Sequence, residues 1–296
     1  MTSIDKDRVI FLASEIEQCP IEQAAFSILP VPYEKTVSYG SGTAAGPAAI
    51  INASEQLETW DGQSNPSSLG IHTCATVNCN TDAEDVIYTI ANAVRNILEN
   101  GSMPVVLGGE HTVTYGVIKG YLDAGINDFG VVQIDAHADL RDAYEDDPLS
   151  HASVMKRIID DDIPLYQLGV RAYCEEGKTL RETNPNIFYQ DADEIVPDNI
   201  QRIHLPESFP KKVFFTVDVD GFDPSVFPST GTPVPGGLNW HQALGLFESV
   251  AKQREIIGFD IMEFSPIEGF HAYDFAAALL SYKLMGIIQR ISTLAE

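Results

Sequence analysis

The stretch GVVQIDAHAD (residues 130–139) decides the fold of this 296-residue chain. Its first half, GVVQI, is rich in β-branched residues and lacks polar alternation, which predicts a strand buried on both faces. Asp135, His137 and Asp139 follow at alternate positions, so in extended backbone their side chains project to one side. Such an ending is typical of a parallel sheet in an α/β protein, where ligands bind outside the carboxyl ends of the strands.

Similar apolar runs elsewhere alternate with segments that have helical spacing. The runs predict strands over residues 104–107, 165–169, 212–219 and 256–262, with helices over 82–98 and 271–290. This alternation predicts an α/β fold built on a parallel sheet. The Pro/Gly/Ser/Thr-rich segment 227–237 is too short for a linker and is expected to be an ordered loop. We therefore expect one domain over residues 1–296.

The composition narrows the class of protein. Hydrophobic residues make up 44% and the mean hydropathy is −0.04, which predicts a globular chain with a sizeable core. The formal net charge of −25 argues against nucleic acid, because binding it needs clustered Lys and Arg, and favours cationic partners. Residues 1–10 lack a signal-peptide pattern, and no apolar run could span a membrane, so a cytoplasmic protein is expected. Four cysteines without CxxC spacing are expected to be free thiols.

Two more strands end in polar residues of the same kind. Asp218 and Asp220 follow the run KVFFTV, and His111 follows PVVLGGE where a helix is expected to begin. Alone, a DxD pair is often a solvated strand end and a histidine often a polar group at a helix start. The trio of Asp135, His137 and Asp139 is more specific, because polar residues after a buried strand need partners. Three such loops at one sheet edge define one cleft.

The charge of this cleft predicts metal. Several carboxylates in one pocket would repel one another unless cations neutralise them. Carboxylate and imidazole ligands without thiolate favour a borderline-hard ion, with manganese preferred over zinc and with iron or cobalt possible. A pair of such ions bridged by carboxylates would activate water, which makes the cleft a hydrolase centre. Glu263 after the last strand is expected to be functional, and Asp260 within that strand to be structural.

Five motifs together resemble the ureohydrolases, the family of arginase, agmatinase and their relatives. They are GGEHTVTYG (108–116), QIDAHADLRD (133–142), SHASVMKRI (150–158), FTVDVDGFDPSVFPSTGTPVPGGL (215–238) and GFDIMEFSP (258–266). The chain looks most like agmatinases. The resemblance implies a three-layer α/β/α fold with a mostly parallel central sheet, two Mn²⁺ ions per chain, and hydrolysis of a guanidinium to urea and an amine. It also implies a homo-oligomer, either a trimer or a hexamer.

The resemblance assigns roles residue by residue. Its six metal ligands fall on the side chains already singled out, namely His111, Asp135, His137, Asp139, Asp218 and Asp220, with Asp135 and Asp218 as bridges.

Further roles come from the same motifs. The proton-transfer histidine corresponds to His151, the guanidinium-binding glutamate to Glu263, and a residue that supports this glutamate to Thr232. From the residues alone, His151 could equally be a loop histidine held by a backbone hydrogen bond. Glu110 departs from the aspartate usual before the ligand histidine, and we expect it to shift His111 slightly without abolishing metal binding.

Substrate specificity is expected in the loop between Asp139 and His151. Arg141 replaces an asparagine of arginase, which counts against arginine. Asp142 and Glu145 offer carboxylates to a free ammonium, which favours agmatine, cleaved to putrescine. Arg141 would oppose this preference if it points inward, and the acidic loop could instead be solvated surface.

Other substrates and other functions stay open on the sequence. The substrate could be guanidinobutyrate, another guanidino acid, aminopropylagmatine, arginine or formimidoylglutamate. A deacetylase-like amidohydrolase shares the fold, but it would not need the second ion that His111 and the pair Asp139 and Asp220 supply. A metal-stabilised, non-catalytic subunit is also possible, although His151 and Glu263 argue against it.

Overall fold

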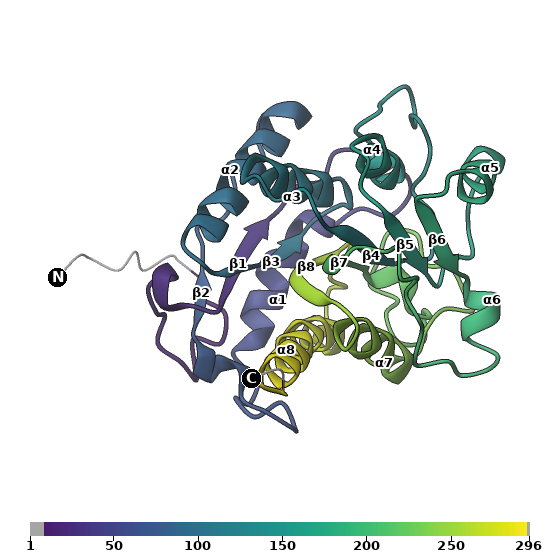
Figure 1. The fold of residues 1–296 in the computed structure, drawn as a ribbon. Coiled ribbons are helices and arrows are strands. Elements are labelled where there is room, and N and C mark those ends of the chain that lie inside the picture. Colours follow the sequence, from purple (N-terminus) through teal and green to yellow (C-terminus); the bar gives the residue numbers. More distant parts are fainter. Residues whose placement is uncertain (1–8, 295–296) are drawn as a thin grey trace.

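The computed structural model describes residues 9–294, so most of the N-terminal segment in which no signal peptide is expected lies outside the described residues. Within this range eight strands form one sheet, and every pairing is parallel (Figure 1). In chain order they are β1 (Phe26–Val31), β2 (Ile71–Thr73), β3 (Met103–Gly108), β4 (Gly130–Ile134), β5 (Leu165–Leu168), β6 (Ile187–Gln190), β7 (Lys212–Asp218) and β8 (Glu255–Met262). Across the sheet the order is β2-β1-β3-β8-β7-β4-β5-β6.

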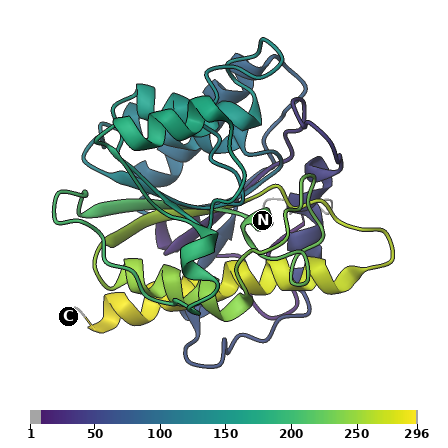
Figure 2. The same cartoon turned by 90° about the vertical axis from the view of Figure 1, so that its right-hand side faces the viewer.

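Helices cover both faces of the sheet, which confirms the three-layer α/β/α prediction (Figures 1 and 2). One layer contains α2 (Ala83–Glu99), α3 (Thr112–Asp123), α4 (Val154–Asp160) and α5 (Glu175–Thr183). The other contains α1 (Gly46–Ser54), α6 (Ala192–Ile195), α7 (Trp240–Ala251) and α8 (His271–Leu294). In the first layer α3 packs against α2 and α4, and in the second α8 packs against α1 and α7.

The strands are apolar throughout because both of their faces are buried. Along β4, Val131 packs into the core on one side of the sheet and Val132 into the core on the other. Both side chains are fully buried. The strand is therefore the doubly covered one that the run GVVQI predicts.

All five predicted strands and both predicted helices are present, with ends that differ by a few residues at most. The sequence analysis missed β1, β2 and β6. β2 is only three residues long, and β6, although as long as β5, is mostly not buried and so lacks the fully apolar pattern of that strand. β1 contains Pro30, which argues against a central strand, but β2 pairs only with residues 26–28, so the proline lies beyond that pairing. Residues 227–237 form no helix or strand, as predicted.

The strand order brings the predicted site residues together. β3, β8, β7 and β4 are neighbours at the centre of the sheet, although they are far apart in sequence. Their carboxyl ends lead to His111, Glu263, Asp218 and Asp135, respectively.

Two further expectations concern membranes and thiols. No helix within residues 9–294 combines the length and the apolar character that crossing a bilayer requires. None of the four cysteines forms a disulfide, as the sequence predicts.

Candidate metal centre

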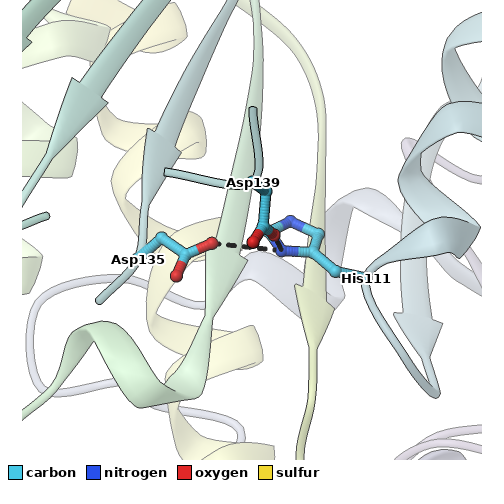
Figure 3. Close-up of side chains that lie close together, drawn as sticks. All are labelled: His111, Asp135 and Asp139. Carbon is cyan, nitrogen blue, oxygen red and sulfur yellow. Dashed lines mark ion pairs between the residues drawn. The ribbon is translucent and has the colours of Figure 1, made fainter. Parts of the chain in front are cut away.

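One group of ligands surrounds His111, which lies at the start of α3. Its Nδ1 is 3.2 Å from Oδ2 of Asp135, 3.2 Å from Oδ2 of Asp139 and 3.4 Å from Oδ2 of Asp218. Figure 3 shows the carboxylates of Asp135 and Asp139 pointing toward this imidazole, with dashed lines marking the ion pairs. The backbone of Asp139 lies in the left-handed region, at φ 50°, and this turn brings its carboxylate back toward His111.

A second group surrounds His137. Its Nδ1 lies 2.9 Å from Oδ2 of Asp220 and 3.6 Å from Oδ1 of Asp135. Asp135 therefore faces a different histidine with each of its oxygens. The six predicted ligands thus form two adjacent sets that share this carboxylate. Asp218 contributes Oδ2 to the first set, while its Oδ1 accepts the backbone N–H of Asp220 at 2.8 Å.

The donor set fits divalent metal ions. Nδ1 of His111 is buried and has no hydrogen-bond partner among the described residues, although three carboxylates surround it. Imidazole nitrogen and carboxylate oxygen are the donors that borderline-hard divalent ions accept. The two groups described above are therefore suited to hold a pair of such ions.

Without cations, protons must balance the charge of the cluster. Burial would lower the pKa of His137, but Asp220 and Asp135 raise it to about 12. Burial and then the charge of Asp135 raise the pKa of Asp139 to about 6. Burial, with the charges of Asp220 and Asp135, raises the pKa of Asp218 well above its usual range. Divalent cations would replace these protons, because a ligand histidine must be neutral and a ligand carboxylate ionised.

Polar residues in the strands hold the ligands in place. Gln133 in β4 donates its side-chain amide to Oδ2 of Asp135 at 2.6 Å, and Gln167 in β5 donates to the side-chain oxygen Oε1 of Gln133 at 2.6 Å. Both glutamines are fully buried. The sequence analysis did not single them out, although a glutamine inside an apolar strand is a signal that could have found them.

A similar chain supports His111 from the other side. Its Nε2 lies 2.9 Å from the hydroxyl of Thr216 in β7, and Thr216 lies 3.4 Å from the hydroxyl of Thr114. Thr114 donates to Oδ2 of Asp260 at 2.8 Å. Asp260, expected to be structural, therefore lies at the end of a hydrogen-bonded chain that leads to a ligand. Burial raises the pKa of its carboxyl to about 6.

Arg171, in the loop after β5, was also missed. Its Nη2 donates to the backbone carbonyls of Asp220 (2.7 Å), Phe222 (3.1 Å) and Val234 (2.7 Å). These bonds tie the ligand loop after β7 to the ordered loop 227–237. No local sequence pattern around Arg171 predicts this role, because its partners are backbone carbonyl groups of segments far away in sequence.

Glu263 and His151 lie beside the ligands and contact each other. Oε1 of Glu263 accepts the backbone N–H of His111 at 2.7 Å and lies 3.1 Å from Nδ1 of His151. Glu263 adopts a left-handed φ of 60°, a conformation that is costly for a residue other than glycine and is frequent at functional sites. Burial would lower the pKa of His151, but its hydrogen bond with Glu263 raises it to about 9.

A cavity of about 200 Å³ opens onto these groups. Four predicted ligands line it together with His151, Glu263 and Thr232, and Ser38 and Tyr144 are lining residues that the sequence analysis missed. A second compartment of about 230 Å³ shares His137, Asp139, Arg141 and Ala152 with the first. The additional wall comes from the loop after β5 and the start of α5, residues 172–177.

Three of the predicted site residues make other contacts in the structure or lie outside the cavity walls. Thr232 was expected to support Glu263, but its hydroxyl donates to Oδ2 of Asp220 at 3.3 Å. Asp142 pairs with Arg157 at 2.9 Å instead of lining either compartment, because the basic side chains of α4 draw it away. Glu145 is exposed and is likewise absent from both walls.

Arg141 lines both compartments, as the sequence analysis allowed. Its guanidinium lies 5.6 Å from the centre of the Tyr144 ring.

Among known protein families, the model described as "Arginase family" matches residues 24–286 of this chain. The chain belongs to the arginase family. It is 39% identical to an N(1)-aminopropylagmatine ureohydrolase of Synechocystis sp. over 89% of each chain. It is 30% identical to an agmatinase of Pyrococcus horikoshii, which covers 93% of this chain and 96% of that protein. The structure of the agmatine ureohydrolase of Thermoplasma volcanium superposes with a TM-score of 0.81 at 25% identity, over 98% of this chain and 97% of that one.

Arginase-family ureohydrolases are hydrolases that act on C–N bonds, and this chain is one of them. The prediction of a ureohydrolase is therefore confirmed. The two alternatives, a deacetylase-like amidohydrolase and a non-catalytic metal-binding subunit, are not supported.

Proposed function

We propose that this chain hydrolyses the guanidinium group of agmatine, releasing urea and putrescine. The observation that carries the proposal is the position of Glu263, a buried carboxylate that lines the cavity beside both ligand groups. A planar guanidinium pairs with a carboxylate through charge-assisted hydrogen bonds. Glu263 would therefore hold the substrate at the mouth of the metal centre.

The ligand residues would hold two divalent ions, which when bound supply activated water at neutral pH. Glu263 would orient the guanidinium so that its central carbon faces this water. As water adds and the C–N bond to the amine breaks, the departing nitrogen needs a proton. His151 carries one below its raised pKa of about 9, and its buried Nε2 has no hydrogen-bond partner among the described residues. It is therefore suited to act as the general acid.

A specific observation favours N(1)-aminopropylagmatine as a second candidate substrate. The two compartments together offer more room than a guanidinium and a short amine tail require. The Synechocystis relative, at 39% identity, is named for this longer substrate. Arg141 lies at the junction of the compartments and would repel a second ammonium unless its side chain moves toward solvent.

A panel of guanidino compounds tests the substrate. Manganese-loaded protein is incubated with agmatine, N(1)-aminopropylagmatine, arginine, 4-guanidinobutyrate and formimidoylglutamate, and urea and formamide are measured. We expect urea from the two amines with kcat/KM at least tenfold above that for any of the three carboxylate compounds. Preference for 4-guanidinobutyrate that disappears in Arg141→Ala would assign Arg141 to a carboxylate and overturn the amine proposal.

Manganese as the physiological ion, a cytoplasmic role in polyamine synthesis, and a trimeric or hexameric assembly remain proposals. Light scattering of the purified protein tests the assembly, and a monomer would contradict it. Metal analysis of protein purified without added metal tests the ion.

A further inference from the structure

Glu110, the residue that departs from the family's usual aspartate, is fully buried beside the metal centre. Its Oε2 accepts the backbone N–H groups of Lys35 at 2.5 Å and Thr36 at 2.7 Å. Its Oε1 accepts the hydroxyl of Thr36 at 2.6 Å and lies 2.9 Å from the hydroxyl of Thr112. A buried carboxylate with this many donors is a rigid anchor, so it fixes the loop after β1 against the start of α3.

Thr36 extends this anchor to His151. The Thr36 hydroxyl that donates to Glu110 also accepts the backbone N–H of His151 at 2.9 Å. On the other side of Ser150, the hydroxyl of Thr112 lies 3.1 Å from the carbonyl oxygen of Leu149. The backbone N–H of His151 is therefore held by a hydroxyl that also contacts Glu110, whereas the single proton of the Thr112 hydroxyl is shared between Glu110 and the carbonyl oxygen of Leu149.

His151 needs such an anchor because residues 140–150, which precede it, contain no helix or strand. His151 begins a single 3-10 turn (His151–Ser153), and its ring reaches across to Glu263 at 3.1 Å. A small displacement of this backbone would move the ring relative to the substrate. Misplacement of a catalytic group by about 1 Å can cost a factor of about 100 in rate.

We propose that Glu110 is a positioning residue that holds His151 in place through Thr36. The inference rests on the proposed function of His151, and it explains why the longer side chain is used at this position. Aspartate is one methylene group shorter, so from the same backbone it would not reach the N–H groups of residues 35 and 36 together with the Thr36 hydroxyl. The resemblance to the ureohydrolases assigns no role to the contact between Glu110 and Thr36.

Three threonine variants test the proposal. Thr36→Val removes the acceptor for the N–H of His151, whereas Thr36→Ser keeps it. Thr43→Val is the matched control, because Thr43 is buried in the same loop and donates to Glu34 at 2.8 Å. We expect Thr36→Val to lower kcat about tenfold with KM changed less than twofold and metal content unchanged, and Thr36→Ser and Thr43→Val to stay within twofold of wild type. Glu110→Asp should resemble Thr36→Val.

A double-mutant cycle separates positioning from a general structural effect. In a His151→Ala background, Thr36→Val should lower kcat no further, because its effect acts through His151. If Thr36→Val costs the same factor in both backgrounds, or if Thr43→Val matches it, the proposal is wrong.

Amide hydrogen exchange tests the contact independently of activity. In metal-free protein, exchange of the His151 amide should become at least tenfold faster in Thr36→Val and stay unchanged in Thr43→Val. Unchanged exchange in Thr36→Val would overturn the proposal. A wild-type protein that releases no urea would instead refute the proposed function, and the exchange result would still decide whether Thr36 holds His151.

Discussion

Oδ2 of Asp135 lies 3.2 Å from Nδ1 of His111, and both side chains are fully buried. The other oxygen of the same carboxylate faces His137. Asp135 is thus the one residue that both ligand groups contain. Because a buried carboxylate needs compensating charge, Asp135 requires cations or protons near each of its two oxygens.

Replacing Asp135 should remove metal from both groups. We expect Asp135→Asn to bind less than one ion per chain and to release urea at least a hundredfold more slowly, since an amide cannot supply the lost negative charge. Asp128→Asn, at an exposed position, is the control and should behave as wild type. Metal analysis and a urea assay check both variants. Full metal content and full activity in Asp135→Asn would refute the assignment of Asp135 as a ligand shared by both groups.

His151 should matter for turnover and not for metal. His151→Ala is expected to retain both ions and to lower kcat by a factor of about 10² to 10⁴, the range for loss of a general acid. His241→Ala, on the exposed side of α7, serves as the control. If His151→Ala turns over agmatine at the wild-type rate, the proton-transfer role is excluded.

Metal binding should release protons. The pKa of His137 is raised to about 12 without cations, so this imidazole is charged at pH 7 and must lose its proton to bind metal. Calorimetric titration of metal-free protein with Mn²⁺ in buffers of different ionisation enthalpy should reveal at least about one proton released per chain. Since Asp139 takes up a proton as the pH falls through about 6, affinity should weaken further below that value. Binding without proton release would contradict this assignment.

Arg171 should hold the ligand loop after β7. Arg171→Met leaves several carbonyl groups without a donor, and we expect the unfolding free energy to fall by about 3 kcal/mol, with weaker metal binding. Arg95→Met is the control, because Arg95 forms a largely exposed pair with Glu99. Denaturant unfolding measures the unfolding free energy of both variants. Equal values would contradict the proposal that Arg171 holds the ligand loop.

The sequence predicts the centre of this fold better than its edges. β4 and β7 are long apolar runs whose polar endings stand out, so their ligands could be named in advance. β2 and β6 are edge strands; β2 has only three residues, and β6 is mostly not buried, so neither shows the apolar run that marks the equally short β5. β1 was missed for another reason, because its Pro30 argues against a strand, although β1 pairs with β3 along its whole length and with β2 only over residues 26–28.

Site residues were predictable where a local motif carries them. The ligands after β4 and β7 belong to such motifs, whereas Arg171 and Thr36 act through partners far away in sequence. Asp142 shows the opposite case, a residue near the motif that lies outside the cavity walls. It lies near the site in sequence, but Arg157 on α4 pairs with it, and only the packing of that helix determines this outcome.

We expect the two adjacent ligand groups to hold a pair of metal ions. Anomalous diffraction at the manganese edge from protein that releases urea tests it most directly. We predict two peaks per chain, one beside Nδ1 of His111 and one beside Nδ1 of His137. A single peak, or manganese bound away from both histidines in active protein, would contradict it.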